Sequence, residues 1–205
     1  MAAQSDPSFR PTYVTPAVNG LPALNFAGSG KRLEFTPTGF PSGAGARTVF
    51  VVCKPPSYTD RCIHVGYATP NESYRTFDIS GPAYAHAGRV SAHYWDGIYG
   101  TQEYPLTNPP VWSMMLLRLA EGATMNQVEV HFNGVQQTTI SLYPQNPVDP
   151  TQPDTGLTVG YIGGRPYFYV TTGAQIAMVG VFNEALSSGD LALLNAYISE
   201  KYAIF

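Results

Sequence analysis

Aromatic and polar side chains cluster between positions 93 and 99, where the sequence runs His-Tyr-Trp-Asp-Gly-Ile-Tyr. The faces of tyrosine and tryptophan rings stack on sugar rings, while carboxylate and amide groups hydrogen-bond to sugar hydroxyls. An asparagine that could add such a hydrogen bond occurs upstream. We therefore take five residues as candidate glycan contacts: Tyr94, Trp95, Asp96, Tyr99 and Asn71.

Packing inside the protein is the competing interpretation of this aromatic cluster. Tyr94 and Trp95 continue a strand predicted at residues 89–94. Successive side chains of a strand point to opposite faces, so one of the two rings must face the core. Core or interface packing therefore remains open for these aromatics.

The two cysteines, Cys53 and Cys62, flank a short polar segment that contains two prolines. If this segment is a hairpin loop, pairing Phe50 with Val65 puts the two cysteines directly opposite each other. A cross-strand disulfide then becomes geometrically possible. Two reduced, half-buried thiols are the alternative, because the redox environment of the protein is unknown.

The sequence lacks the residue patterns of common catalytic and cofactor sites. Its four histidines are scattered, with no metal-ligand spacing between them. It contains neither a Gly-x-Ser-x-Gly elbow nor a glycine-rich phosphate-binding loop between a strand and a helix. We therefore expect no metal, no other cofactor and no enzyme activity.

Short apolar segments separated by turn residues predict an all-β protein. Residues 47–53 form the most hydrophobic strand, rich in β-branched residues, and residues 112–119 form a second buried strand. Residues 127–140 predict a hairpin, because Asn133-Gly134 suits a type I′ turn. Strands that follow one another without helices between them predict antiparallel sheets in two layers.

One amphipathic helix is predicted at residues 191–202. Its apolar residues recur at spacings of three and four and so share one face: Leu191, Leu194, Ile198 and Tyr202. Ser187 and Asp190 before it resemble a capping box. We expect this helix to lie on the sandwich as a lid.

Composition limits the classes of partner. The chain has 205 residues, which fits one domain, and only 12% of them are charged, with a net charge of −3. The lysines and arginines form no cluster of the kind that phosphate contacts need, so we expect no nucleic-acid partner. No apolar run is long enough to predict a membrane span.

The first 18 residues predict an extended N-terminal arm, followed by one domain at residues 19–205. Pro7, Pro11 and Pro16 disfavour regular structure in the arm. The N-terminus also lacks the apolar core of a secretory signal, which favours a protein made in the cytoplasm and released from it. A chain trimmed before an added Met1 is the other explanation.

Several segments in order resemble the concanavalin A-like, laminin-G-like jelly-roll family, in its bacterial and phage form. They are Asn-Gly-Leu-Pro-Ala-Leu-Asn-Phe-Ala-Gly from position 19, Thr-Val-Phe-Val-Val from 48, Trp112, Val-His-Phe-Asn-Gly from 130, Val-Gly-Tyr-Ile-Gly from 159, Gln-Ile-Ala-Met-Val-Gly-Val-Phe-Asn-Glu-Ala-Leu-Ser-Ser from 175, and the ending Asn-Ala-Tyr-Ile-Ser-Glu-Lys-Tyr from 195. The resemblance covers residues 12–205 and implies a two-layer antiparallel β-sandwich with one C-terminal helix. It says less about function, since this fold carries lectins, glycanases and structural modules.

Glycan hydrolases of this family place acidic residues alternately on one strand, so that the acid and the nucleophile project from the same face. No predicted strand of this chain carries that pattern. Glu129 and Asp78 each stand alone in their strands. The resemblance therefore implies a binding or structural module rather than a hydrolase.

These observations lead to two functional expectations. The first is a non-enzymatic virion protein that decorates or cements a phage capsid, or belongs to a fibre or tail. It would be made in the host cytoplasm, and its N-terminal arm would reach a capsid or other virion protein. The alternative is a lectin-like, glycan-binding module on a cell surface or virion exterior.

The uncharged stretch at residues 155–162 and the aromatic residues in and after it predict a homo-oligomer or a contact with a partner lattice. Edge strands of monomeric sandwiches are usually protected by charge, and exposed aromatics often mark protein contacts. The predicted contact residues are Tyr161, Tyr167, Phe168 and Tyr169. Packing of the following loop onto the helix around Tyr197 is the alternative.

Overall fold

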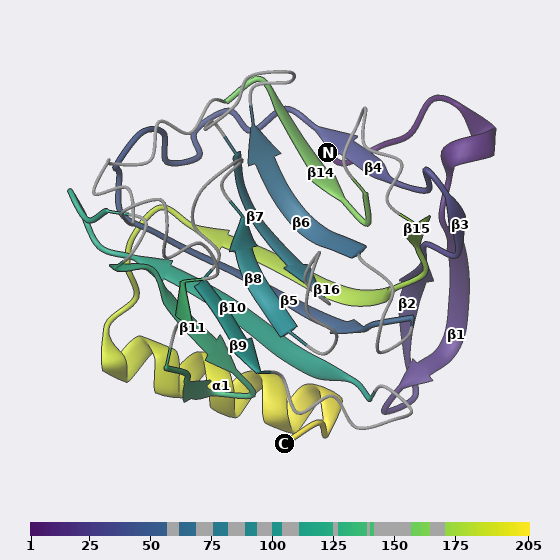
Figure 1. The fold of residues 1–205 in the computed structure, drawn as a ribbon. Helices are drawn as coiled ribbons and strands as arrows, with labels where there is room; N and C mark the ends of the chain where they lie inside the picture. The colour runs from purple at the N-terminus through teal and green to yellow at the C-terminus, as the bar shows by residue number, and fades with distance from the viewer. Residues whose placement is uncertain are drawn as a thin grey trace.

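The computed structural model describes residues 1–56, 62–68, 76–81, 89–93, 100–103, 111–124, 127–138, 140–141, 157–164 and 171–205. Its strands form two large antiparallel sheets that face each other (Figure 1). Sheet I has the order β1 (Thr12–Val18), β2 (Leu21–Asn25), β16 (Gln175–Phe182), β5 (Arg47–Lys54), β10 (Ser113–Leu119), β11 (Glu129–Phe132) and β12 (Val135–Gln136).

Sheet II has the order β13 (Ile140–Ser141), β9 (Gly100–Glu103), β8 (Arg89–His93), β7 (Thr76–Gly81), β6 (Cys62–Ala68), β14 (Val159–Ile162) and β4 (Leu33–Phe35). A small third sheet pairs β3 (Gly28–Ser29) with β15 (Thr171–Thr172). One 3-10 turn, η1 (Pro7–Phe9), precedes the strands, and one α-helix, α1 (Ser188–Tyr202), ends the fold. The predicted two-layer antiparallel sandwich with one C-terminal helix is confirmed.

The main core fills the space between the two sheets. Val49, Val51 and Cys53 alternate along β5 and face this core, which sheet II completes with Val65, Tyr67, Phe77 and Ile79. The residues between them, Phe50 and Val52, belong to a second cluster on the opposite face of sheet I. The middle of β5 is therefore buried on both faces, which explains the continuous apolar run at residues 49–53.

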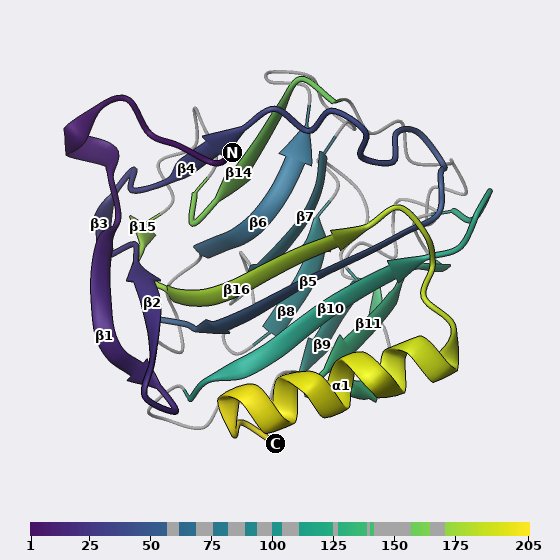
Figure 2. The same cartoon turned by 180° about the vertical axis from the view of Figure 1, so that it is seen from behind.

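Helix α1 covers the outer face of sheet I (Figure 2). Ile198 and Tyr202 are buried there, and Leu191 and Leu194 pack partly buried beside them. At the N-terminus of α1 the Ser187 hydroxyl donates a hydrogen bond of 2.6 Å to Asp190 Oδ2. It also accepts a hydrogen bond of 3.2 Å from the backbone amide of Asp190. The predicted helix, its apolar stripe and its cap are therefore confirmed. None of the helices in the described ranges is long and apolar enough to cross a membrane.

The Asn-Gly turn between β11 and β12 is confirmed by its backbone. Asn133 and Gly134 both have positive φ, 45° and 78°, as a type I′ turn requires. The Asn133 side chain also accepts the Met114 amide at 2.9 Å, which ties the turn to β10. The hairpin is shorter than predicted, because β12 contains only Val135–Gln136.

The prediction of an extended arm at residues 1–18 is wrong. Residues 12–18 form β1, which pairs with β2. Pro16 is tolerated in β1 because this strand lies at the edge of sheet I, where not every amide needs a partner. Residues before it pack on β4: Ala3 and Glu34 exchange two backbone hydrogen bonds of 2.8 Å, and the Arg32 guanidinium lies 4.6 Å from the centre of the Phe9 ring.

Candidate functional site

The topology of sheet II brings the connections that carry the predicted glycan contacts to one end of the sheet. Asn71 lies in the segment that joins the end of β6 to the start of β7, and residues 94–99 join the end of β8 to the start of β9. In the antiparallel order β9-β8-β7-β6, the ends of β6 and β8 point the same way (Figure 1). One strand separates them, a distance of about 10 Å. Asn71, Tyr94, Trp95, Asp96 and Tyr99 themselves lie outside the described residues.

A continuous row of paired residues crosses sheet II close to this end. Tyr161 of β14 is opposite Gly66 of β6, which is opposite Asp78 of β7, which is opposite His93 of β8. The neighbours of Gly66 and Asp78 along their strands face the inter-sheet core. By alternation, Gly66 and Asp78 therefore belong to the outer face of sheet II.

A buried hydrogen bond runs along this row. The Tyr161 hydroxyl donates to Asp78 Oδ2 at 3.1 Å, and both residues are 0% exposed. The bond passes over Gly66, where a Cβ would lie 2.3 Å from Asp78 Cβ and 2.9 Å from the Tyr161 hydroxyl oxygen. Glycine is therefore required at position 66 for the tyrosine to reach the carboxylate.

A second buried hydroxyl lies on the inner side of the same sheet. Tyr67 faces the inter-sheet core and accepts a hydrogen bond of 3.1 Å from Arg47 Nη1. Arg47 also donates to the carbonyl oxygen of Gly45 at 2.9 Å. Burial raises the pKa of the Tyr67 hydroxyl and lowers the pKa of the Arg47 guanidinium, because it disfavours the charged form of each. This pair links the first residue of β5 to β6 and belongs to the core rather than to the outer face.

The prediction that Tyr161 is a surface contact is wrong. Tyr161 is fully buried, and β14 is an inner strand flanked by β4 and β6. An uncharged sequence favours pairing with another chain at a sheet edge, whereas β14 already has a partner strand on each side. Tyr167, Phe168 and Tyr169 lie outside the described residues, so their role in an interface stays a prediction.

The hairpin that would bring the cysteines together is not formed. β5 lies in sheet I and β6 in sheet II, and the register partners of Cys53 are Ser113 and Ile176. The pairing of Phe50 with Val65 is therefore wrong, and with it the geometric argument for a Cys53–Cys62 disulfide. The Cys62 side chain lies outside the described part of the structure, so the bridge itself remains untested.

The two acidic residues considered for hydrolysis lie in different sheets. Asp78 belongs to sheet II, whereas Glu129 lies in sheet I, where it pairs with Arg118 at 2.6 Å and contacts His131 at 3.3 Å. Arg118 also donates to the Leu186 carbonyl at 2.7 Å, so this cluster anchors the segment before α1. Among the described residues, no group of three or more His, Cys, Asp or Glu side chains could hold a metal ion.

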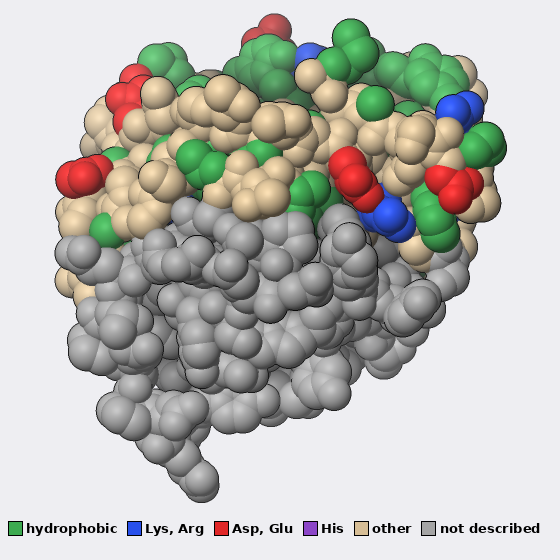
Figure 3. All heavy atoms as spheres, turned by 90° about the horizontal axis from the view of Figure 1, so that it is seen from above, with side chains coloured by type: hydrophobic (Ala, Val, Ile, Leu, Met, Phe, Trp, Pro, Cys, Tyr) green, Lys and Arg blue, Asp and Glu red, His purple; other side chains and the backbone are tan. Residues whose placement is uncertain are grey.

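Charged side chains are mixed on the face seen from above (Figure 3). A few acidic and basic side chains are scattered over the described part of this face, and the basic ones do not gather into a stripe. One opposite-charge pair joins β4 to the residue before it, since Arg32 Nε lies 2.6 Å from Glu34 Oε1.

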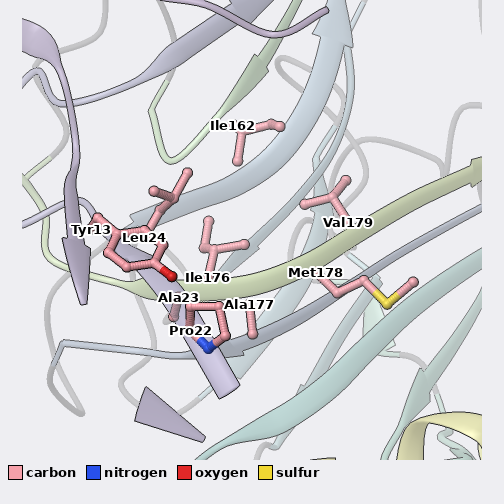
Figure 4. Close-up of a pocket in the computed structure, with 9 residues that line it drawn as sticks. All are labelled: Tyr13, Pro22, Ala23, Leu24, Ile162, Ile176, Ala177, Met178 and Val179. Atoms are coloured by element: carbon pink, nitrogen blue, oxygen red, sulfur yellow. The ribbon is translucent and has the colours of Figure 1, made fainter. Parts of the chain in front are cut away.

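The structure also contains an apolar hollow that the sequence analysis missed (Figure 4). It has a volume of about 350 Å³ and lies where β2 and β16 separate, since these strands pair only at Gln175 and Ile176. Its lining residues are Tyr13, Pro22, Ala23, Leu24, Ile162, Ile176, Ala177, Met178 and Val179. Such walls suit an apolar group better than a sugar, which needs several hydrogen-bonding partners. No local pattern could have predicted the hollow, because it forms between segments far apart in the sequence.

Comparison with known proteins identifies the fold but no family. No family profile matches the chain, and neither does any curated protein sequence. Among solved structures, domain 4 of AbnA, an extracellular GH43 arabinanase from Geobacillus stearothermophilus in complex with arabinotriose, is similar with a TM-score of 0.61. The identity is 17%, and the match covers 90% of this chain and 81% of that one.

Two further solved structures belong to larger proteins or domains. The ligand-binding domain of botulinum neurotoxin serotype D in complex with N-acetylneuraminic acid has a TM-score of 0.61 at 9% identity, and the match covers 96% of this chain and 50% of that one. Trypanosoma rangeli sialidase in complex with sialic acid has a TM-score of 0.58 at 12% identity, covering 92% of this chain and 29% of that one. The chain therefore shares the β-sandwich fold of these proteins over nearly its whole length, while spanning half or less of the toxin domain and the sialidase.

Proposed function

We propose that this chain is a carbohydrate-binding β-sandwich module without catalytic activity. The observation that carries the proposal is the fold similarity, which extends over at least 90% of the chain to structures solved with arabinotriose and with sialic acids. A fold alone can serve many functions, so the proposal also needs a plausible site.

The proposed site lies at the end of sheet II from which the connections after β6 and β8 leave. Trp95 and its neighbouring tyrosines would stack on a sugar ring, and Asn71 and Asp96 would hydrogen-bond to its hydroxyls. The antiparallel order of β6, β7 and β8 supports this grouping of residues that are more than twenty positions apart in the sequence.

An extracellular or cell-surface location follows from this proposal, since free glycans and glycoconjugates are found there. We rank the virion role below it. That role relied on residues 1–18 reaching a neighbouring protein. In the structure Ala3 bonds to β4, Phe9 contacts Arg32 just before β4, and residues 12–18 belong to sheet I.

A glycan array followed by calorimetry with the best ligand tests the proposal. We expect binding to neutral or acidic glycans, and we expect Trp95→Ala to weaken it roughly tenfold or more, because a stacking ring is lost. Tyr197→Ala is the matched control, since Tyr197 is an exposed aromatic residue on α1.

Two results would count against the proposal in different ways. A chain that binds no glycan on the array has a different function. A chain that binds a glycan with the same dissociation constant in the Trp95→Ala and Tyr197→Ala variants is a lectin whose site lies elsewhere.

A further inference from the structure

We infer that Asp78 and Tyr161 are positioning residues of the proposed glycan site. Their hydrogen bond fixes the end of β8, and the segment that contains Trp95 starts there. The inference rests on the proposed function, but it concerns two residues that need not touch the sugar.

Asp78 lies at one end of the pairing between β7 and β8. Only three residue pairs join β7 to β8, and the pair Asp78–His93 is the last of them before β8 ends. Trp95 follows two positions later. The backbone of Asp78 is therefore the last described strand contact that orients the chain as it enters the aromatic segment.

A hydrogen bond from Tyr161 holds the Asp78 side chain. Tyr161 lies on β14, and its hydroxyl donates to the Asp78 carboxylate on β7 at 3.1 Å. The bond therefore crosses β6, which lies between these two strands. A side chain at position 66 would block this path, so Gly66 is part of the arrangement. The bond thus connects three adjacent strands in the row that ends at His93.

The Asp78–Tyr161 pair places a carboxylate in a fully buried position. A fully buried carboxylate is unfavourable unless it is hydrogen-bonded, and an apolar residue would be the less costly choice for sheet packing alone. A directional bond between a phenol and a carboxylate, by contrast, fixes the relative position of the strands that carry them. This favours a role in holding geometry over a role in burying surface.

Tyr161→Phe tests the inference, because it removes one hydroxyl and leaves the ring. We expect the dissociation constant of the best glycan to rise about three- to tenfold, the range expected for one lost hydrogen bond. Asp78→Asn retains an oxygen that can accept from Tyr161, so it should have the smaller effect.

Tyr67→Phe is the control for stability. It also removes a buried phenol hydroxyl from sheet II, but on the side that faces the core and Arg47. We expect it to lower the melting temperature without changing the glycan dissociation constant. Equal dissociation constants in the two phenylalanine variants would overturn the inference while leaving the proposed function intact.

A second readout does not depend on glycan binding. The chain has two tryptophans, so Trp112→Phe leaves Trp95 as the single tryptophan, whose fluorescence can be excited selectively over that of the tyrosines. In this background we expect Tyr161→Phe to increase acrylamide quenching of Trp95, and Tyr67→Phe to leave it unchanged. Equal quenching in both variants would overturn the claim that this bond orders the Trp95 segment. If the chain binds no glycan, the proposed function fails, and quenching still tests that ordering.

Discussion

Gly66 leaves room for a hydrogen bond between Tyr161 and Asp78 because it has no Cβ. The tyrosine–aspartate bond on the outer face of sheet II passes over its Cα, and an added methyl group would lie 2.3 Å from Asp78 Cβ and 2.9 Å from the Tyr161 ring. Both neighbours are buried, so neither can move aside into solvent. A single missing atom thus permits a contact between β14 and β7, two strands apart.

Gly66→Ala should lower the free energy of unfolding by about 1–3 kcal/mol, as expected for overpacking in a buried site. Urea denaturation followed by circular dichroism measures this change. Gly189→Ala is the matched control, since position 189 lies in α1 with only the Ser187 hydroxyl oxygen near, at 3.7 Å. The control should be neutral or stabilising, because alanine favours helices. Equal stability of the two variants would show that sheet II adjusts freely at position 66.

At the scale of the element, α1 is held at both ends as well as along its apolar face. The Ser187 side chain caps its N-terminus, and the Asn19 amide donates to the Lys201 carbonyl at 3.0 Å near its C-terminus. Asn19 belongs to the turn between β1 and β2, so the helix is tied to the edge of sheet I. The second core cluster between α1 and β5 depends on this placement.

Ser187→Ala should destabilise the protein by about 1 kcal/mol, because the Asp190 amide loses its capping oxygen. The melting temperatures of the Ser187→Ala and Ser188→Ala variants measure the effect. Ser188→Ala is the control, since Ser188 is the first helical residue and follows the capping residue. The control should change stability by less than about 0.5 kcal/mol. Equal melting temperatures in the two variants would mean that tertiary packing alone sets where the helix begins.

At the scale of the whole molecule, the N-terminal segment covers an open edge of the sandwich. β4 is the last strand of sheet II, and Glu34 on it exchanges two backbone hydrogen bonds with Ala3. Arg32 adds a backbone hydrogen bond of 2.9 Å to the Phe9 carbonyl and stacks its guanidinium on the Phe9 ring. Uncovered edge strands are sites where a second chain can pair.

Deletion of residues 1–10 should therefore promote self-association. We expect the average molar mass from light scattering to rise more steeply with concentration than for the full chain. Phe9→Ala in the full chain is the control, because it keeps the backbone bridge between Ala3 and Glu34. If the deleted and full chains have the same mass at every concentration, β4 needs no cover, and any oligomer forms through another surface.

The sequence by itself determined the parts of this protein that depend on neighbouring residues. The spacing from Leu191 to Tyr202 fixes which helical face is apolar, and the positive φ angles that Asn133 and Gly134 adopt are a local property of the turn. The β-branched, apolar residues at 47–53 predicted the most hydrophobic strand, which is β5 in the structure. The all-β sandwich with one helix followed from such local signals, because periodicity is set by backbone geometry.

Tertiary structure decided which strands lie side by side, and therefore which residues meet. Cys53 lies opposite Ser113 and Ile176 instead of Cys62, and Tyr161 is buried beside Gly66 instead of exposed at an edge. The hollow at β2 and β16 and the bond to Asp78 depend on the same pairings. Strand pairing between distant segments is chosen by the free energy of the complete sheets, which many residues share. No local pattern of the chain encodes it.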